Sequence, residues 1–378
     1  MSEILVNTIK KADGTGNLSV PAETGTVVTT ASPSLGRRNA LINGDMTICQ
    51  RGGEGSSATF GSTNTYHIDR WLGREDTDGA LASNHSTEAP DGFRYSQKVT
   101  VTTADASLGA AQKAYFSQRI EGTNFAQFAF GTAGAKTVTL SFYVRSSVTG
   151  TFSGSLTNQA NNRAYVFEYA ISSADTWERK EVTITGDTSG TWATTSSTWS
   201  ELYFDLGVGS NFEGTAGSWV AAQDFGSSGS TKLINTLNAT WYITGVQLEV
   251  GSVATPFEHR SYGEELALCQ RYYYRISGRR ILATGHMFAA DQFYGNIFFP
   301  VEMRDVITLS WADSSNYYRC YSGSSTLYSS GLSGTQSNYN GGCSTGFYIS
   351  FGGSLTRGDG AWIQIMDDDA WVDFSAEL

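Results

Sequence analysis

Residues that could act as nucleophile and base are few and scattered in this chain. Gly342–Gly346 matches Gly-x-Ser-x-Gly, the nucleophile elbow of α/β hydrolases. That elbow needs a strand before the serine and a helix after it, whereas Phe347–Phe351 has the composition of a strand. No histidine follows Ser344 to serve as a base. We therefore interpret the motif as a chance match in a sequence rich in glycine and serine.

Residue spacing also argues against metal and nucleotide chemistry. The four histidines (His67, His85, His259 and His286) form no His-x-His and no i, i+4 pair, and the four cysteines form no C-x-x-C. A Gly-Lys dipeptide is absent, which excludes a Walker A phosphate loop. We expect no cofactor. Cys320 and Cys343, 23 residues apart, either form a disulfide or remain free thiols.

Paired carboxylates are the remaining route to catalysis. Glu75–Asp78 and Asp367–Asp369 are the densest acidic clusters. A glycosidase would need two carboxyl groups about 5 to 9.5 Å apart across a groove. Solvated acidic turns are the simpler interpretation, and the repeats of many polysaccharide-cleaving spikes are absent. We expect a protein that is not an enzyme, with a carboxylate-pair glycan hydrolase as an alternative.

Binding chemistry is better represented, in the segment Asp313–Gly346, which is rich in Tyr, Ser, Gly and Asn. This is the composition of adaptable recognition loops, in which tyrosine supplies rigid contact area. Sugars present apolar faces and hydroxyl edges, which suit aromatic stacking and amide hydrogen bonds. The alternative is that these tyrosines pack in the core or between subunits. The predicted glycan-binding residues are Tyr317, Tyr318, Tyr321, Tyr328, Tyr339, Asp313, Asn316 and Asn338.

The elements that would position these residues are mostly strands. Aromatic residues make up 13% of the 378, and 42 glycines stand against 5 prolines, a balance that favours strands and tight turns. The predicted fold is therefore all-β. Short runs with period-two alternation predict strands at Val138–Arg145, Arg179–Thr185, Trp199–Val208, Thr240–Glu249, Gly295–Phe299, Val306–Trp311, Phe347–Phe351 and Ala361–Met366.

Four regions follow from this pattern. Residues 1–38 read as an extended N-terminal arm with a short strand at Val6–Lys10, and 39–261 as a jelly-roll β-sandwich. Gly263–Arg271, with acidic residues first and arginine last, predicts a helix within a connector spanning 262–276. Residues 277–378 read as a smaller C-terminal β-sandwich.

Charge and hydropathy restrict the partners. The chain has 25 basic and 36 acidic residues and a net charge of -11, without a basic stripe, so nucleic acid is not an expected partner. No signal peptide is recognisable at the start, and no window approaches about 18 consecutive apolar residues, so no membrane insertion is expected. These features suit a virion component made in a host cytoplasm.

Several motifs resemble a domain of tailed-bacteriophage tail-fibre and receptor-binding proteins. Its opening is similar to Arg38–Gly52 and Tyr66–Trp71, and its closing strand to Trp241–Gly251 followed by Ala254–Glu258. Shorter similarities to fibre proteins occur at Val6–Ile9 and at Phe299–Arg304. The resemblance covers about residues 39 to 275 and implies a jelly roll similar to carbohydrate-binding modules.

The resemblance further implies a homotrimer, located in the virion tail fibre, that contacts a host surface polysaccharide with its distal domain. Attachment to a tail, baseplate or adaptor protein would use the arm residues Val6, Asn7, Thr8 and Ile9. Related binding modules often hold a structural calcium ion, for which Asn43 and Asp45 are candidates here, although Gly245 stands where an Asp is expected. A purely architectural head or tail decoration is the alternative function.

Overall fold

The computed structural model describes residues 9–10, 17–18, 37–314, 317–323, 325–329, 344–350 and 355–378. The chain divides into two compact units, Met1–Gly36 and Arg37–Leu378. Each unit is considered by itself.

In the first unit, strands β1 (Ile9–Lys10) and β2 (Asn17–Leu18) pair antiparallel, with Ile9 opposite Leu18. The predicted attachment residue Ile9 thus begins a strand of a hairpin. Val6, Asn7 and Thr8 lie outside the described residues.

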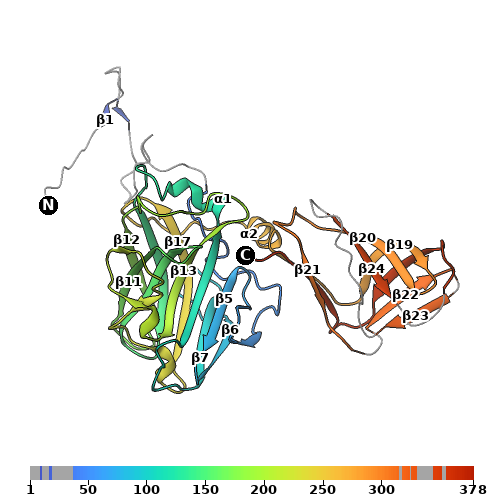
Figure 1. The fold of residues 1–378 in the computed structure, drawn as a ribbon, viewed down its shortest axis with the longest axis horizontal. Coiled ribbons are helices and arrows are strands. Elements are labelled where there is room, and N and C mark those ends of the chain that lie inside the picture. Colours follow the sequence, from blue (N-terminus) through green and yellow to red (C-terminus); the bar gives the residue numbers. More distant parts are fainter. Residues whose placement is uncertain are drawn as a thin grey trace. The chain divides into compact units, whose positions relative to one another are not determined.

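Two antiparallel sheets form a large β-sandwich in the second unit (Figure 1). One has the order β15-β11-β10-β13-β8-β5-β4 and the other β12-β9-β17-β7-β6-β3. Neighbouring strands are often distant in sequence, as in the long connections of Greek-key and jelly-roll folds. The strands are β3 (Ser57–Thr59), β4 (Thr65–Tyr66), β5 (Trp71–Asp76), β6 (Ala80–Ser86), β7 (Ser96–Thr103), β8 (Lys113–Glu121), β9 (Val138–Ser146), β10 (Gly150–Asn158), β11 (Ala164–Ile171), β12 (Glu178–Ile184), β13 (Trp199–Val208), β15 (Trp219–Val220) and β17 (Thr240–Val250).

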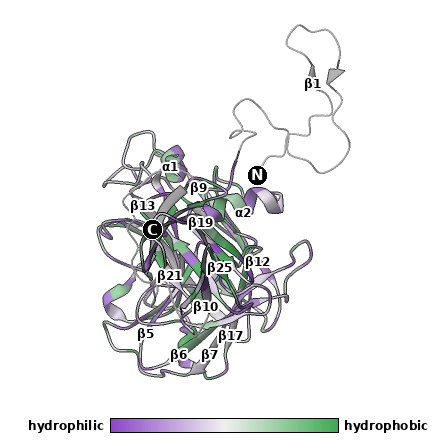
Figure 2. Cartoon of the chain, turned by 90° about the vertical axis from the view of Figure 1, so that its right-hand side faces the viewer, coloured by the Kyte–Doolittle hydropathy of each residue, from purple (hydrophilic) through white to green (hydrophobic). Residues whose placement is uncertain are grey.

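Aromatic residues from both sheets form the centre of this sandwich. Trp71 in β5 and Trp241 in β17 are both fully buried. The Phe116 ring stacks on Trp71 with ring centroids 5.0 Å apart and meets Trp241 edge-on at 6.0 Å. Burying rings of this size is the main stabilisation that a two-layer sheet can gain. Figure 2 shows that the strands carry both hydrophobic and hydrophilic residues, as expected for sheets with one face inside.

Helices are short and few among the described residues. The longest, α2 (Tyr262–Gln270), starts at Ser261, whose hydroxyl accepts from the Glu264 N–H while the Glu264 side chain accepts from the Ser261 N–H. Cys269 of this helix is buried together with Ile42 and Ile48 of the first sandwich, so α2 packs against the first sandwich. The other short elements are α1 (Gly122–Phe125), η1 (Ala126–Phe128), η2 (Ser210–Phe212), η3 (Leu233–Asn235), and the parallel pair β14 (Glu213–Gly214) and β16 (Gly226–Ser227).

A second, smaller sandwich follows α2. Its three-stranded sheet has the order β18-β26-β21 and its six-stranded sheet the order β23-β22-β25-β19-β20-β24. These strands are β18 (Tyr273–Ser277), β19 (Arg280–Ala289), β20 (Gln292–Phe298), β21 (Thr308–Trp311), β22 (Tyr318–Ser322), β23 (Ser325–Ser329), β24 (Ser344–Ser350), β25 (Gly360–Ile365) and β26 (Trp371–Ser375). Residues 273–276, placed by the sequence in the connector, are part of strand β18.

The predicted all-β fold, with two β-sandwiches and one short helix between them, is confirmed. The structure contains each of the eight predicted strands, with ends shifted by a few residues. The predicted helix is α2, one residue displaced from the predicted range.

Candidate functional site

The predicted glycan-binding tyrosines separate into buried and exposed residues. Tyr318 is fully buried, and its hydroxyl donates to the carbonyls of Ala312 and Trp371 at 3.0 and 2.8 Å. The prediction that Tyr318 contacts a ligand is therefore wrong, because the ring is part of the C-terminal core. Tyr317 is half-buried against the same core, and Asp313 is exposed. Asn316, Asn338 and Tyr339 lie outside the described residues.

Tyr321 and Tyr328 do face outward, but from strands instead of a loop. Along β22, Tyr318 and Cys320 point into the core while Arg319 and Tyr321 point out, which is the alternation of any strand. Tyr328, in the neighbouring strand β23, is opposite Arg319 and half exposed. These residues therefore belong to the outer face of the six-stranded sheet.

Cross-strand pairing extends this face over the next strands. Tyr321 is opposite Trp362, Trp362 is opposite Thr284, and Thr284 is opposite Asn296. The Tyr321 and Trp362 rings stack with centroids 4.9 Å apart and an interplanar angle of 24°. The Trp362 ring is 38% exposed. In the middle of a sheet, an exposed tryptophan thus stacks on a half-buried tyrosine.

The outer face of the six-stranded sheet exposes several large hydrophobic side chains. Of the nine large hydrophobic residues identified as exposed in the described part of the chain, five lie on this sheet. Contiguous exposed apolar surface of this kind marks binding sites. We call this surface the aromatic face and define it by Tyr321, Tyr328, Trp362, Ile281, His286, Phe288, Tyr294 and Phe298, with the polar residues Arg319, Gln364, Thr284 and Asn296 between them.

Hydrogen-bonding groups lie among these rings. The Arg319 guanidinium lies over the Tyr321 ring at 4.1 Å and near Tyr328 at 5.8 Å, and its Nη2 donates to Gln364 Oε1 at 2.9 Å. The His286 ring is 5.9 Å from Tyr294. Rings that stack and side chains that donate or accept on one exposed surface can bind a ligand with flat apolar sides and polar edges.

Composition did not predict most residues of the aromatic face, although the alternation of residues along one strand indicates part of it. Strand β25 alternates buried Ala361, Ile363 and Ile365 with outward Trp362 and Gln364. A tryptophan at the outward position of such a strand is unusual, because large rings normally fill cores. Period-two alternation could therefore have identified Trp362.

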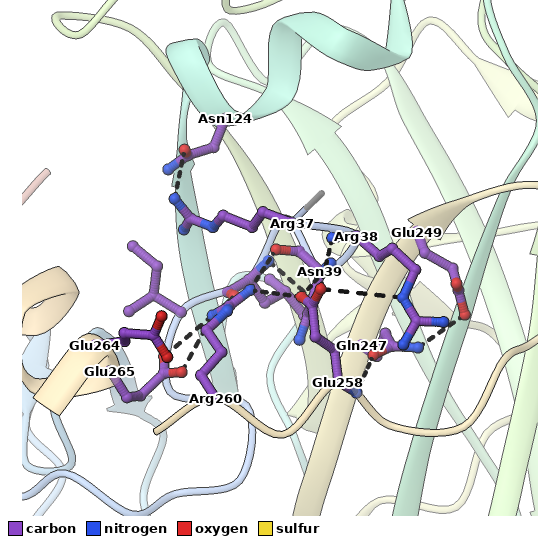
Figure 3. Close-up of polar contacts among 12 residues, drawn as sticks. Arg37, Arg38, Asn39, Asn124, Gln247, Glu249, Glu258, Arg260, Glu264 and Glu265 are labelled. Carbon is purple, nitrogen blue, oxygen red and sulfur yellow. Dashed lines mark hydrogen bonds and ion pairs between the residues drawn. The ribbon is translucent and has the colours of Figure 1, made fainter. Parts of the chain in front are cut away.

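The opening and closing motifs of the first sandwich form a structural clasp (Figure 3). The Glu258 carboxylate accepts from the main-chain N–H groups of Arg38 and Asn39 at 2.9 and 3.0 Å. The Asn39 amide in turn donates to the Val246 carbonyl and accepts from Leu248. These contacts join the segment that opens the domain to its last strand, β17, and to the segment that follows β17.

Arg260 completes this clasp on the side of helix α2. Its guanidinium donates to the carbonyls of Asn39 and Leu41 and pairs with the Glu258 and Glu265 carboxylates, each at 3.2 Å (Figure 3). These partly buried charges thus satisfy one another, which offsets the cost of removing them from water. The residues of the clasp therefore stabilise the fold.

Asn43, one of the two candidate calcium ligands, is bonded within the chain. Asn43 is fully buried, and its side-chain amide donates to the carbonyls of Ile48 and Asp69 and accepts from the Ile48 N–H. Both ends of the amide are therefore occupied. Asp45 accepts from the Thr47 N–H at 3.3 Å. In the described part of the chain, no three His, Cys, Asp or Glu side chains cluster as metal ligands.

Gly245 has a steric role at the position where an Asp was expected. It adopts φ +62°, and a Cβ there would lie 2.7 Å from the Phe93 ring. Phe93 packs against Tyr143 and Phe257 at 5.3 and 5.2 Å, and the three rings line a surface pocket of about 510 Å³ together with His259 and other residues. The glycine therefore makes room for the Phe93 ring.

The acidic clusters have partners within the chain. Asp76 pairs with Arg74 at 3.1 Å, and Glu75 accepts from the Thr77 N–H and hydroxyl. Asp367 accepts from the Asp369 N–H within its own turn. Glu75 is buried in strand β5, whereas Asp368 and Asp369 lie exposed in a turn, so only the second cluster fits the simpler interpretation.

Two further expectations concern the cysteines and membranes. Cys320 is a free, buried thiol whose sulfur lies 3.8 Å from that of Met287, and Cys343 lies outside the described residues. Among the described residues, no helix has the length and apolarity needed to cross a membrane.

No protein-family model and no curated protein matches the chain. Its similar solved structures include a protein described as "CBM4 structure and function" (13% identity, TM-score 0.27), with 55% of this chain and 98% of that chain covered. A putative sugar binding protein from Bacteroides thetaiotaomicron VPI-5482 is 13% identical (TM-score 0.29), with 57% of this chain and all of that one covered.

The enzymatically active domain of tailspike protein 4 of bacteriophage CBA120 is also similar, at 14% identity and a TM-score of 0.28. The match covers 56% of this chain but only 21% of the tailspike chain. At these TM-scores the likenesses carry no conclusion about function, which has to come from the side chains.

Proposed function

We propose that this chain is a glycan-binding subunit of a tailed-phage fibre, and that it holds sugars on the aromatic face without cleaving them. The observation that carries the proposal is the stack of the half-buried Tyr321 on the exposed Trp362 in the middle of a sheet. The apolar surface of such rings is in contact with water in the unliganded protein, which is unfavourable in free energy. A ligand that covers them regains that free energy.

A sugar ring has the shape and polarity to cover this surface. Its flat C–H side can stack on Trp362 or Tyr328, while its hydroxyl groups reach the side chains of Gln364, Thr284 and Asn296 between the rings. Because these residues stand on strands, their spacing is fixed by the sheet. The site is therefore largely formed before the ligand arrives, which lowers the entropic cost of binding.

The test compares Trp362→Ala and Tyr321→Ala with Tyr262→Ala on a glycan array and in titrations with the glycans that bind. Tyr262 is a suitable control because its ring, in helix α2, is 62% exposed and outside the aromatic face. The two face variants should bind about tenfold or more weakly, as expected when a central interface aromatic is truncated. The control should bind like the unchanged protein.

Two outcomes would overturn this proposal. One is unchanged glycan binding by both face variants. The other is a change in oligomeric state by light scattering with glycan affinity intact, since this would make the aromatic face a contact between subunits. Release of new reducing ends from a bound polysaccharide would contradict the non-enzymatic part of the proposal.

The fibre assignment, with its homotrimer and tail attachment, is supported by the resemblance of Arg38–Gly52 and Val6–Ile9 to fibre proteins. Deleting residues 1–36 should remove the protein from purified virions while leaving glycan binding intact. The deletion stops before Arg38, because the Arg38 N–H donates to Glu258 in the clasp. Normal incorporation of the shortened chain, or a location on the head in a virion density map, would favour the architectural alternative.

A further inference from the structure

Arg319 is distinguished from most arginines of this protein by having no carboxylate partner. Fourteen other arginines form ion pairs in the described structure, whereas Arg319 forms none there. Its contacts are the Tyr321 and Tyr328 rings and the neutral Gln364 amide. The positive charge on the aromatic face is therefore uncompensated by its neighbours.

The sheet that carries Arg319 is free of acidic residues. None of its six strands contains Asp, Glu or Lys, in a chain with 36 acidic residues and a net charge of -11. Asp359 precedes β25 and is five residues from Gln364, the cross-strand partner of Arg319, which is about 16 Å along a strand. That separation exceeds the screening length of about 8 Å at physiological ionic strength.

The guanidinium is also held in a fixed orientation. Stacking on Tyr321 sets its plane, and the bond from Nη2 to Gln364 sets its direction within that plane. No described residue accepts a hydrogen bond from Nη1 or from the buried Nε. A held guanidinium loses less conformational entropy on binding an anion than a free one, and it favours ligands that match its fork.

We infer that the glycan bound on the aromatic face is acidic, and that Arg319 pairs with its carboxylate or phosphate group. This inference rests on the proposed function, since it names the class of glycan for the same site. A charge-assisted hydrogen bond is stronger than a neutral one, and an anion on this face meets no acidic side chain of the sheet. The rings would contribute affinity to any sugar, and Arg319 would select the charged ones.

The test uses matched pairs of ligands. One pair is a uronic acid oligosaccharide and its carboxyl-reduced form, and the other is a phosphate-bearing oligosaccharide and its dephosphorylated form. The unchanged protein should bind the acidic member of at least one pair about 10- to 100-fold more tightly, as expected for a hydrogen bond to a charged group. The pair that shows the preference identifies the anionic group.

Variants of Arg319 separate charge recognition from stacking. Arg319→Gln should abolish the acidic preference while keeping the weaker binding of the neutral member, and Arg319→Lys should keep part of the preference. Arg279→Gln is the matched control, because Arg279 belongs to the same sandwich, is 63% exposed and pairs with Asp368 at 3.8 Å. The control should leave the preference unchanged, and thermal unfolding should verify that every variant is folded.

The outcomes distinguish this inference from the function on which it rests. Equal binding of both members of each pair by the unchanged protein would overturn the acidic preference and leave glycan binding in place. An equal loss for both members in Arg319→Gln would also overturn it, because Arg319 would then only brace the rings. Failure of every glycan to bind, or no effect of Trp362→Ala, would instead refute the proposed function.

Discussion

Replacing Gly245 by alanine tests how the closing strand of the first sandwich is built. Gly245 lies in β17, where pairing with β9 shifts register between Thr244 and Gln247. Its φ of +62° is in the left-handed region, and an added Cβ would lie 2.7 Å from the Phe93 ring and 3.0 Å from Tyr143. Alanine would therefore lower the stability in two ways, through its unfavourable backbone conformation and through the steric overlap of its Cβ.

The two penalties can be estimated and separated. A non-glycine residue in the left-handed region costs about 1 to 2 kcal/mol. Moving a packed ring to admit a methyl group costs about 1 to 3 kcal/mol more. Gly55→Ala supplies the backbone term alone, because Gly55 has φ +76° and no atom would lie within 4 Å of its Cβ. We expect Gly245→Ala to lower the free energy of unfolding by about 2 to 5 kcal/mol and Gly55→Ala by the smaller amount.

Urea unfolding followed by tryptophan fluorescence measures both variants, since Trp71 and Trp241 are buried in the sandwich concerned. Equal destabilisation by the two substitutions would refute the steric part of this reasoning. A wild-type stability for Gly245→Ala would refute both parts. Gly245→Asp should be at least as destabilising as alanine, because it places a larger side chain at the same crowded position.

Three further predictions concern buried polar groups. Tyr318→Phe should lower the unfolding free energy by about 1 to 2 kcal/mol, because it removes the O–H donor that the Ala312 and Trp371 carbonyls share, and should leave glycan affinity unchanged. Asn43→Ala should lower the melting temperature, while a chelator should leave the melting temperature of the unchanged protein where it is. Burial raises the pKa of Asp69 to about 6, so the folded state favours the protonated carboxyl and this contribution to stability is lost as pH rises through 6. Burial lowers the pKa of His67 to about 4, so the folded state favours the neutral ring and this contribution is lost as pH falls from 6.5 through 4. Between pH 4 and 6 the two groups change the unfolding free energy in opposite directions, each by at most about 1.4 kcal/mol per pH unit. Asp69→Asn leaves only the effect of His67, so the stability of this variant should rise with pH, whereas the stability of His67→Gln should fall. Thermal unfolding at several pH values would check both.

Local patterns in the sequence were sufficient for most elements of the fold. The strand at Val138–Ser146 alternates strongly enough to be recognised alone, and the acidic residues followed by Arg271 indicated helix α2. Such signals depend on neighbours in the chain. They needed no knowledge of which strands pair.

The candidate site depended on information that is not local. Composition placed Tyr318 and Tyr321 together in a recognition loop, whereas one points into the core and the other to solvent because successive strand residues alternate. Trp362 is 41 residues from Tyr321 in sequence, so only the register of β22 and β25 shows that their rings stack. The motif residue Asn43 was assigned to a possible ion site because its bonds to Ile48 and Asp69 are invisible without the fold.

The clasp that joins Asn39 to Glu258 also has a consequence for how such a protein can change over time. Because the two ends of the first sandwich are hydrogen-bonded to each other, the sandwich can be exchanged between genes through one short junction, with the segments before and after it kept in place. Domains whose ends lie close together tolerate insertion into other chains for the same geometric reason. The first sandwich is thus suited to exchange as a unit, while the aromatic face, which belongs to the second sandwich, can change independently.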